Sequence, residues 1–342
     1  MKAPFVSIIL PVHNEANHIR RSLGAVLQQD YSVENMEVLV ADGLSTDNTR
    51  AIIEELAGQY PKIELKILDN SEQIVPTGLN KALQIARGEI VVRVDGHTMI
   101  APDYIRQCVD TLQRTQADNV GGRMAAVGNT SFGEAVALGT STPFGIGGGR
   151  FHFSDKNEWV DTVYMGAWPR RVFQEVGLFD EELIRDQDDE FNYRLREYGG
   201  RILLSSSIRS EYTVRSTPGS LWRQYYQYGF WKVRVLQKHP RQMRPRQFVP
   251  PLFVFALLVN LALIFITSWS IGLLFIVVGL YLFANFTASI LASRKNNWRY
   301  LGVLPLVFLI LHLGYGLGFL IGLIRFAGRW KDKVGKTPTF MT

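Results

Sequence analysis

Cysteine is nearly absent from this sequence: its 342 residues include one, Cys108. A lone cysteine excludes an intramolecular disulfide and is typical of a protein that folds in a reducing compartment. Cys108 lies in a predicted amphipathic helix, where a buried packing role is commoner than reactivity. A secretory signal is not expected, because the apolar run Phe5–Leu10 is too short and Pro11 and Glu15 follow at once. We therefore expect the first part of the chain in the cytoplasm.

Two glycine signatures of nucleotide sites are also missing. The turn after the first predicted strand reads Pro11-Val12-His13-Asn14-Glu15, without the Gly-x-Gly-x-x-Gly of dinucleotide-binding oxidoreductases. The glycine-rich segment Phe144–Arg150 lacks the Lys-Ser/Thr ending of a P-loop. We expect it to be a loop, and we favour a mobile loop that covers the active site rather than a plain connector.

Charge is almost missing from the last third of the chain. Between Val249 and Ile324, charged residues occur only within Ser293–Arg299. Three apolar stretches fill this region: Val249–Thr267, Ile271–Ala292 and Leu301–Ile324. Each has about the 20 residues that a membrane-crossing helix needs. We predict membrane helices rather than buried core helices.

The net charge of +6 comes from basic residues beside these stretches. They are His239, Arg241, Arg244 and Arg246, then Arg294, Lys295 and Arg299, then Arg325, Arg329, Lys331, Lys333 and Lys336. Basic flanks favour the cytoplasmic side of a membrane and anionic lipid headgroups. The charge therefore indicates membrane topology, and nucleic acid is not an expected partner.

The third apolar stretch has two possible paths. If the basic segments before the first stretch and after the second are cytoplasmic, a third crossing would place the basic tail outside. Pro305 and a glycine row, Gly314, Gly316, Gly318 and Gly322, permit either a tightly packed span or a re-entrant path that keeps the tail inside. Both paths stay open at this stage.

Composition divides the chain into four expected parts. Residues 1–235 are the soluble catalytic domain, and 236–248 are a basic linker or interfacial helix. Residues 249–326 are a membrane region with two or three helices, and 327–342 are a basic tail.

Acidic residues follow three predicted strands in the first hundred positions. Phe5–Leu10 runs into Glu15, Glu37–Val40 into Asp42, and Glu89–Val94 into Asp95. Helical patterns between the strands predict an α/β fold with a mostly parallel sheet and helices on both faces. Ligands bind at the carboxyl ends of the strands in such sheets. The pattern therefore indicates a site for a nucleotide diphosphate and its metal.

A fourth acidic group opens a predicted helix at residues 186–198. Acids in a first turn are stabilised by the helix dipole, and capping alone would explain some of them. Four acids within five residues, from Asp186 to Glu190, repel one another more than capping requires, so we favour a functional role. Phe191, Leu195 and Tyr198 fall on one face of this helix.

These segments resemble the family 2 glycosyltransferases, inverting enzymes with a GT-A fold. The resemblance covers about residues 5–235 and rests on five motifs in the family's order. They are Val6–Glu15, Ala41–Asp47, Gly78–Glu89, Asp95-Gly96-His97 and Gln187-Asp188-Asp189-Glu190 with Arg194. Two departures are Ala41, in place of an acid, and His97, in place of the second Asp of Asp-x-Asp.

A closer likeness is to the bacterial succinoglycan and exopolysaccharide glucosyltransferases. It rests on Asp95-Gly96-His97, Gln187–Phe191, Gln224–Lys232 and a membrane region after the catalytic domain. The likeness implies transfer of a hexose from a UDP-sugar, with UDP-glucose favoured, to a polyprenyl-diphosphate-linked saccharide. Gln224–Tyr228 lacks the Arg-Trp of the processive synthases' Gln-x-x-Arg-Trp motif, so we expect one sugar per encounter.

The resemblance and the chemistry of the side chains together assign site roles. Asp95 would hold a divalent cation, Mn²⁺ or Mg²⁺, against the diphosphate. His97 is either a second ligand of that cation, a direct hydrogen-bond partner of the phosphate, or an incidental turn residue. Asp188 would be the general base for the acceptor hydroxyl. The expected nucleotide-sugar contacts are Pro11, His13, Glu15, Asp42, Lys81, Arg87 and Asp95. Further candidates for pyrophosphate or acceptor contacts are Asp189, Gln224, Arg223, Lys232 and Arg234.

The sequence thus predicts a multi-pass enzyme of the bacterial inner membrane with a cytoplasmic catalytic domain. Its expected partners are a UDP-sugar, a lipid-linked saccharide, membrane lipids and other glycan-assembly enzymes. Two alternatives remain: a polyprenyl-phosphate sugar synthase, and a non-catalytic membrane scaffold with a degenerate transferase domain.

Overall fold

The computed structural model describes residues 3–333 and 335–340, which form two compact units that alternate along the chain. Within the described residues, the first unit comprises 3–125, 150–212 and 335–340. The second comprises 126–149 and 213–333. The domain boundaries at residues 235, 248 and 326 were predicted from changes in charge and hydropathy. They stay predictions.

The first unit begins with parallel strands separated by helices. The strands are β1 (Val6–Val12), β2 (Met36–Asp42), β3 (Glu64–Asp69) and β4 (Ile90–Arg93), in the order β3-β2-β1-β4. The helices between them are α1 (Ile19–Leu27), α2 (Thr49–Gln59) and α3 (Val75–Ile85). The register pairs Val12 with Asp42, and Asp42 with Asp69, so the strand ends lie side by side. The predicted alternation of strand and helix is confirmed here.

Antiparallel pairs follow in the rest of the sheet, β4 with β8, β8 with β6, and β5 and β7 with β9, so the nine-stranded sheet is mixed. It contains β5 (Thr98–Ile100), β6 (Asn119–Val127), β7 (Glu158–Val160), β8 (Ala167–Pro169) and β9 (Ile202–Thr213). The path continues from β4 through β8, β6 and β9 to β5, and β7 pairs with β9. Antiparallel β8 beside β4 brings the segment around Tyr164 to the end of β4.

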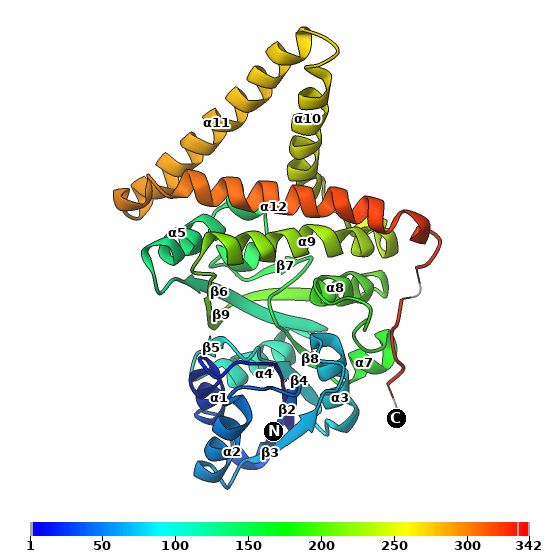
Figure 1. Ribbon diagram of the computed structural model, residues 1–342. Helices are drawn as coiled ribbons and strands as arrows, with labels where there is room; N and C mark the ends of the chain where they lie inside the picture. Colours follow the sequence, from blue (N-terminus) through cyan, green and yellow to red (C-terminus); the bar gives the residue numbers. More distant parts are fainter. Residues whose placement is uncertain (1–2, 334, 341–342) are drawn as a thin grey trace. The chain divides into compact units, whose positions relative to one another are not determined.

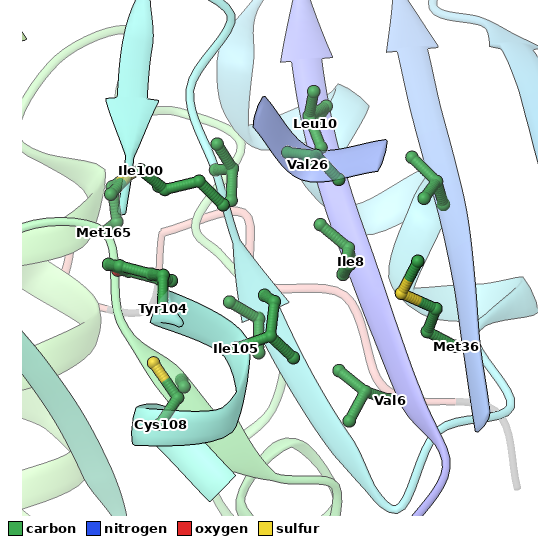
Figure 2. Packing of buried hydrophobic residues seen from close by; sticks show 14 of the residues in the cluster. Val6, Ile8, Leu10, Val26, Met36, Ile100, Tyr104, Ile105, Cys108 and Met165 are labelled. Atoms are coloured by element: carbon green, nitrogen blue, oxygen red, sulfur yellow. The ribbon is translucent and has the colours of Figure 1, made fainter. Parts of the chain in front are cut away.

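Alternating side chains of the strands build a core on each face of the sheet. Ile8 and Leu10 of β1 pack with Tyr104 and Cys108 of α4 (Tyr104–Thr115) on one face (Figure 2). Ile9 packs on the other face, with α3, α7 (Arg171–Val176) and α8 (Gln187–Glu197). Burial raises the pKa of the Cys108 thiol, which keeps it protonated and unreactive. The packing role predicted for this cysteine fits its position.

Asn14 lies in the turn before α1, which begins at Ile19, and its side-chain Oδ1 accepts from the Thr46 backbone N–H at 2.8 Å. Two local expectations need correction. Tyr198 does not share the buried face of α8, because it is 67% exposed. The glycine-rich segment begins with one helical turn, α6 (Pro143–Ile146), and Gly147–Gly148 lies against Arg246 within the second unit.

The second unit is helical. It contains α5 (Ser131–Thr140), α6, α9 (Pro218–Lys238), α10 (Val249–Leu263), α11 (Trp269–Lys295) and α12 (Leu304–Arg325). Short 3₁₀ turns lie at Val33–Asn35 and Arg150–His152 in the first unit, and at Pro240–Gln242, Pro245–Phe248, Trp298–Tyr300 and Ala327–Arg329 in the second. Within this unit α12 lies along α9, and α10 and α11 extend away from both (Figure 1). Three described helices are long and apolar enough to cross a membrane: Pro245–Leu263, Trp269–Lys295 and Leu304–Arg325.

Candidate active site

The turns that follow β1 and β2 are joined by hydrogen bonds. His13 Nδ1 lies 2.8 Å from the Gly43 carbonyl oxygen, and the Asn14 backbone N–H donates to Ser45 Oγ at 2.9 Å. Gly43 allows this approach, because a Cβ there would lie 3.0 Å from the imidazole of His13. The parallel pairing of β1 and β2 places both turns at the carboxyl edge of the sheet. His13 thus lies beside the turn that follows Asp42, and Pro11 lies within β1; their contacts with a nucleotide stay predictions.

Asp42 ends β2 with one carboxylate oxygen engaged and one open. It is 1% exposed, and its Oδ1 accepts from the Ser45 backbone N–H at 3.2 Å and from Ser45 Oγ at 2.6 Å. No hydrogen-bond donor among the described residues reaches Oδ2, and the nearest cation is Arg50, whose guanidinium lies 3.7 Å away. A buried carboxylate oxygen without a donor is costly, so this atom is ready to accept an N–H or O–H from a ligand.

Asp95, just after β4, is held by Arg93 and Tyr164. Arg93 Nε donates to Oδ1 at 2.8 Å and Nη2 to Oδ2 at 3.3 Å, and the Tyr164 hydroxyl lies 3.4 Å from Oδ2. Burial alone would raise the pKa of Asp95, but the charges of Arg93 and His97 lower it on balance. A carboxylate has about four lone-pair sites, so Oδ1 keeps capacity for a further partner.

His97 and Glu15 form a pair beside Asp95. His97 Nδ1 lies 3.1 Å from Glu15 Oε1, and the imidazole packs edge-on against Tyr212, with ring centroids 5.3 Å apart. Among the described residues, no three His, Cys, Asp or Glu side chains gather closely enough to hold a metal ion. The strand ends thus offer Asp95 and His97 as ligands, and a cation would need oxygens from another molecule to complete its coordination.

The acids that open α8 differ in their partners. Glu190 is 2% exposed and pairs with Arg194, whose guanidinium also donates to the carbonyls of Val176 and Leu178, so this acid is structural. Asp189 Oδ1 accepts from Thr162 Oγ1 at 2.9 Å. Asp188 Oδ1 accepts from the Asp189 backbone N–H at 3.1 Å.

Arg93 links Asp188 to the end of β4 electrostatically. Its side chain is almost wholly buried, and no acceptor among the described residues reaches Nη1. Burial acts to lower the pKa of Arg93, but the charges of Asp95 and Asp188 raise it on balance. Asp188 thus acts electrostatically on the arginine that holds Asp95, and its role as the general base stays a prediction.

Two further predicted nucleotide contacts lie at opposite edges of the sheet. Lys81, on α3, is at the carboxyl end of β3, where its ammonium contacts Glu72, the Asp69 carbonyl and Ser71, and its nucleotide contact stays a prediction. Arg87 is at the opposite edge of the sheet, bound to Glu37 and Glu64 at the starts of β2 and β3. The prediction for Arg87 needs correction, because these two carboxylates hold its guanidinium away from the carboxyl ends of the strands.

The predicted diphosphate and acceptor contacts on α9 belong to the second unit. Arg234 is 0% exposed and donates to Gln237 Oε1 and to the carbonyl oxygens of Arg329 and Asp332. This position makes it a structural tie between α9 and the segment after α12, which corrects the prediction of a diphosphate clamp. Lys232 is buried, Gln224 contacts Tyr228 at 2.9 Å, and Arg223 is exposed. Their roles stay predictions.

Sequence reasoning missed Arg93, Tyr164 and Thr162. The spacing of Arg93 and Asp95 was a usable signal, because residues two apart in an extended chain point the same way. Tyr164 and Thr162 come from a segment without strong periodicity, and only the antiparallel pairing of β8 with β4 places them near the strand ends.

Comparison with known proteins agrees with this geometry. A glucuronosyltransferase of Methanococcus voltae, named for acting on dolichyl N-acetyl-α-D-glucosaminyl phosphate, is 29% identical over 94% of this chain and 98% of its own. The succinoglycan biosynthesis protein ExoA of Rhizobium meliloti (strain 1021) is 28% identical over 94% of this chain and 96% of its own. The predicted likeness to succinoglycan transferases is thus supported over almost the whole length.

A solved structure shares the fold. A mannosyltransferase of Pyrobaculum calidifontis, in complex with GDP-Man and Mn²⁺, has a TM-score of 0.59 over 93% of this chain and 88% of its own, at 20% identity. The pattern of the family described as glycosyl transferase family 2 matches residues 7–177, which include β1 to β4 with Asp42 and Asp95. The chain belongs to glycosyl transferase family 2, and it is a glycosyltransferase with a GT-A fold and an apolar helical region after it.

Proposed function

We propose that this glycosyltransferase moves a hexose from a UDP-sugar, with UDP-glucose favoured, to a polyprenyl-diphosphate-linked saccharide, with inversion and with the help of a divalent cation. The proposed setting is exopolysaccharide or related glycan assembly at the cytoplasmic face of the inner membrane. It is supported by full-length similarity to a succinoglycan biosynthesis protein and to a transferase named for a dolichyl-linked sugar phosphate.

The observation that carries the proposal is the pair of carboxylates at the ends of β2 and β4, the two strands on either side of β1. Asp42 keeps a buried oxygen without a donor, which suits an N–H of the base or an O–H of the ribose. Asp95 follows β4, on the other side of β1, and its Arg93-bound carboxylate stays ionised. Asp42 offers a hydrogen-bond acceptor for the nucleoside, and Asp95 offers a negative charge for the cation on the diphosphate. Together they suit the two ends of a nucleoside diphosphate.

A divalent cation fits these residues as a shared ligand of protein and donor. Asp95 and His97 would hold it, and diphosphate oxygens would complete its coordination, because the described residues offer no three-ligand site. When bound, such a cation neutralises the charge that develops on the leaving nucleotide. Carboxylate with imidazole suits Mn²⁺ somewhat better than Mg²⁺.

Asp188 is the proposed general base. The acceptor hydroxyl oxygen forms a bond to the anomeric carbon, the bond from that carbon to the diphosphate oxygen breaks with its electron pair, and the hydroxyl proton passes to Asp188. An ionised Asp188 is favoured by its place in the first turn of α8 and by the nearby charge of Arg93. Asp189, which accepts from Thr162, would orient rather than react.

A donor screen tests the proposal. The purified full chain is mixed with UDP-glucose, other UDP-sugars or GDP-mannose, together with a bacterial lipid extract and Mn²⁺. Product mass and released nucleotide are then measured. We expect one hexose added to a lipid-linked saccharide from a UDP-sugar and none in the Asp95→Ala variant. Transfer from GDP-mannose alone, transfer to lipid phosphate itself, or full activity of Asp95→Ala in excess EDTA would contradict it.

A further inference from the structure

The segment 335–340, called here the C-terminal strap, folds as part of the first unit. Its Lys336 backbone N–H donates to Asp180 Oδ1 at 2.9 Å, and its Lys336 carbonyl accepts from the Glu181 N–H at 2.9 Å. The Pro338 carbonyl accepts from the Leu178 N–H at 3.2 Å, and the ring of Phe340 lies under the guanidinium of Arg170. The strap therefore lies on the same side of any membrane as the catalytic strands.

This position restricts the number of membrane crossings. The chain leaves the first unit after Tyr212 and returns to it after Lys333. A chain that starts and ends on one side of a bilayer crosses it an even number of times. Of the three helices long enough to cross, two or none can do so, and three crossings are excluded.

Burial distinguishes α12 from the other two. In its most apolar stretch 56% of the residues are buried inside the protein, against 17% for the helix ending at Leu263 and 6% for α11. Exposed apolar side chains cover the outside of α10 and α11, among them Phe255, Phe275 and Phe283. Such surfaces are expected where lipid surrounds a helix.

Glycines join α12 to α9 at backbone contact. A Cβ at Gly318 would lie 2.0 Å from the Tyr226 carbonyl oxygen, and one at Gly229 would lie 1.9 Å from the Tyr315 carbonyl oxygen. The two helices therefore enter or avoid a bilayer together. Helix α9 carries four basic residues, Arg223, Lys232, Arg234 and Lys238. Cationic side chains are costly in the hydrocarbon core, so α9 stays out of it and keeps α12 out as well.

The residues that flank α10 and α11 indicate the direction in which these two helices cross the membrane. Arg246 precedes α10 and Arg294 and Lys295 end α11, while the connection 264–268 between the two helices carries no charge. Basic ends mark the cytoplasmic side of a crossing. Exposed tryptophans lie at the start of α11 and just after its end, Trp269 and Trp298, as is usual at the two membrane surfaces.

We infer that the protein crosses the membrane twice, through α10 and α11, and that α12 lies in the plane of the cytoplasmic membrane surface, with α9 on its protein side and lipid on the other. Leu306, Ile321 and Ile324 of α12 are exposed and would enter the lipid headgroup boundary. The strap, on this topology, is cytoplasmic.

Single cysteines in the full chain test this topology without any activity measurement. Exposed positions are chosen: Ser268→Cys between α10 and α11, Asn296→Cys after α11, and Lys331→Cys after α12. The parent chain, whose only cysteine is the fully buried Cys108, serves as the blank. Spheroplasts of a bacterial host are treated with a membrane-impermeant maleimide, before and after permeabilisation.

We expect Ser268→Cys to react in intact spheroplasts, and Asn296→Cys and Lys331→Cys to react only after permeabilisation. Reaction of Lys331→Cys from outside would show that α12 crosses and would overturn the inference. So would a Ser268→Cys variant that reacts only after permeabilisation, because α10 and α11 would then not cross. Failure of the donor screen would leave this labelling pattern unchanged, so the two proposals fail separately.

Discussion

A buried arginine organises the acidic residues of the site. Arg93 binds both oxygens of Asp95 and interacts electrostatically with Asp188 from α8, a helix almost a hundred residues further along the chain. Burial raises the pKa of Asp95, but the charges of Arg93 and His97 lower it on balance, so this carboxylate stays ionised, as an anionic anchor requires.

Replacing the proposed base should separate chemistry from binding. Asp188→Asn keeps size and hydrogen bonding but cannot take a proton, so the single-turnover transfer rate should fall about 10²–10⁴-fold. Donor affinity should stay nearly unchanged. Asp189, which accepts a hydrogen bond from Thr162, gives the matched variant Asp189→Asn, whose transfer rate should fall less. Loss of donor binding in Asp188→Asn would place Asp188 in the nucleotide site, and a larger loss in Asp189→Asn would make Asp189 the base.

Arg93 should act through Asp95 and not on the substrate. Arg93→Lys keeps the charge but cannot donate to both carboxylate oxygens, so Asp95 loses its fixed orientation. Residues that orient a metal ligand typically contribute about 10–100-fold to metal affinity. We expect the Mn²⁺ concentration for half-maximal transfer to rise by that factor, while transfer recovers at saturating Mn²⁺. Arg123→Lys, at an exposed pair with Asp155, is the control. An unchanged Mn²⁺ titration would contradict the role.

For single residues, the positions of side chains at strand ends could be predicted from the sequence, whereas those of side chains in or just after helices could not. Asp42 and Asp95 follow apolar strands directly, so the sequence alone places them at one edge. Arg87 follows a helix, and only the structure shows that Glu37 and Glu64 hold it at the other edge. Arg234 belongs to a basic, aromatic helix, whose pattern does not distinguish a ligand contact from a buried tie.

Among the elements, α9 and α12 form the closest helix pair of the second unit. Their glycines bring carbonyl oxygens of each helix to where the other has no Cβ. Hydropathy and length describe α10, α11 and α12 alike, so the sequence could not decide the path of the third apolar stretch. The glycine row was the useful signal, and its partner could be identified only from the folded contacts.

A leucine at Gly318 should separate α9 from α12. Its side chain would overlap the backbone of Tyr226, and overpacking a tight interface typically costs about 1–3 kcal/mol, occasionally more. Gly318→Leu should lower the melting temperature of the detergent-solubilised protein. Gly279→Leu is the matched control, because no atom lies within 4 Å of its Cβ position on α11. Equal melting temperatures for the two variants would show that the α9–α12 contact contributes little.

For the whole molecule, binding of the donor nucleotide should increase the free energy of unfolding. A ligand that binds the folded state at 100 times its Kd stabilises it by about 2.7 kcal/mol. UDP with Mn²⁺ should therefore raise the melting temperature of the parent chain, UDP with EDTA should raise it less, and Asp95→Asn should abolish the Mn²⁺-dependent part. A full shift in EDTA would mean that nucleotide binding needs no cation. Asp155→Asn, at an exposed residue, should behave as the parent.

The broad architecture was predictable because it follows from local patterns. Strand and helix alternate in the first hundred residues with clear periods, and the apolar stretches are longer than a core helix needs. The alternation of the two units along the chain was not predictable, because nothing in residues 335–340 marks them as partners of Leu178 and Asp180.

The strap also sets an order for biogenesis. Residues 177–181 receive their backbone partners from a segment that the ribosome makes after the whole apolar helical region. Domains usually fold as their residues emerge, but this one cannot be completed until the later helices have been synthesised. Its last contacts form only when the strap returns. On the inferred topology, a chain whose α10–α11 hairpin inserted in the wrong orientation would leave the catalytic unit unfinished, and maturation of the enzyme would be coupled to correct delivery to the membrane.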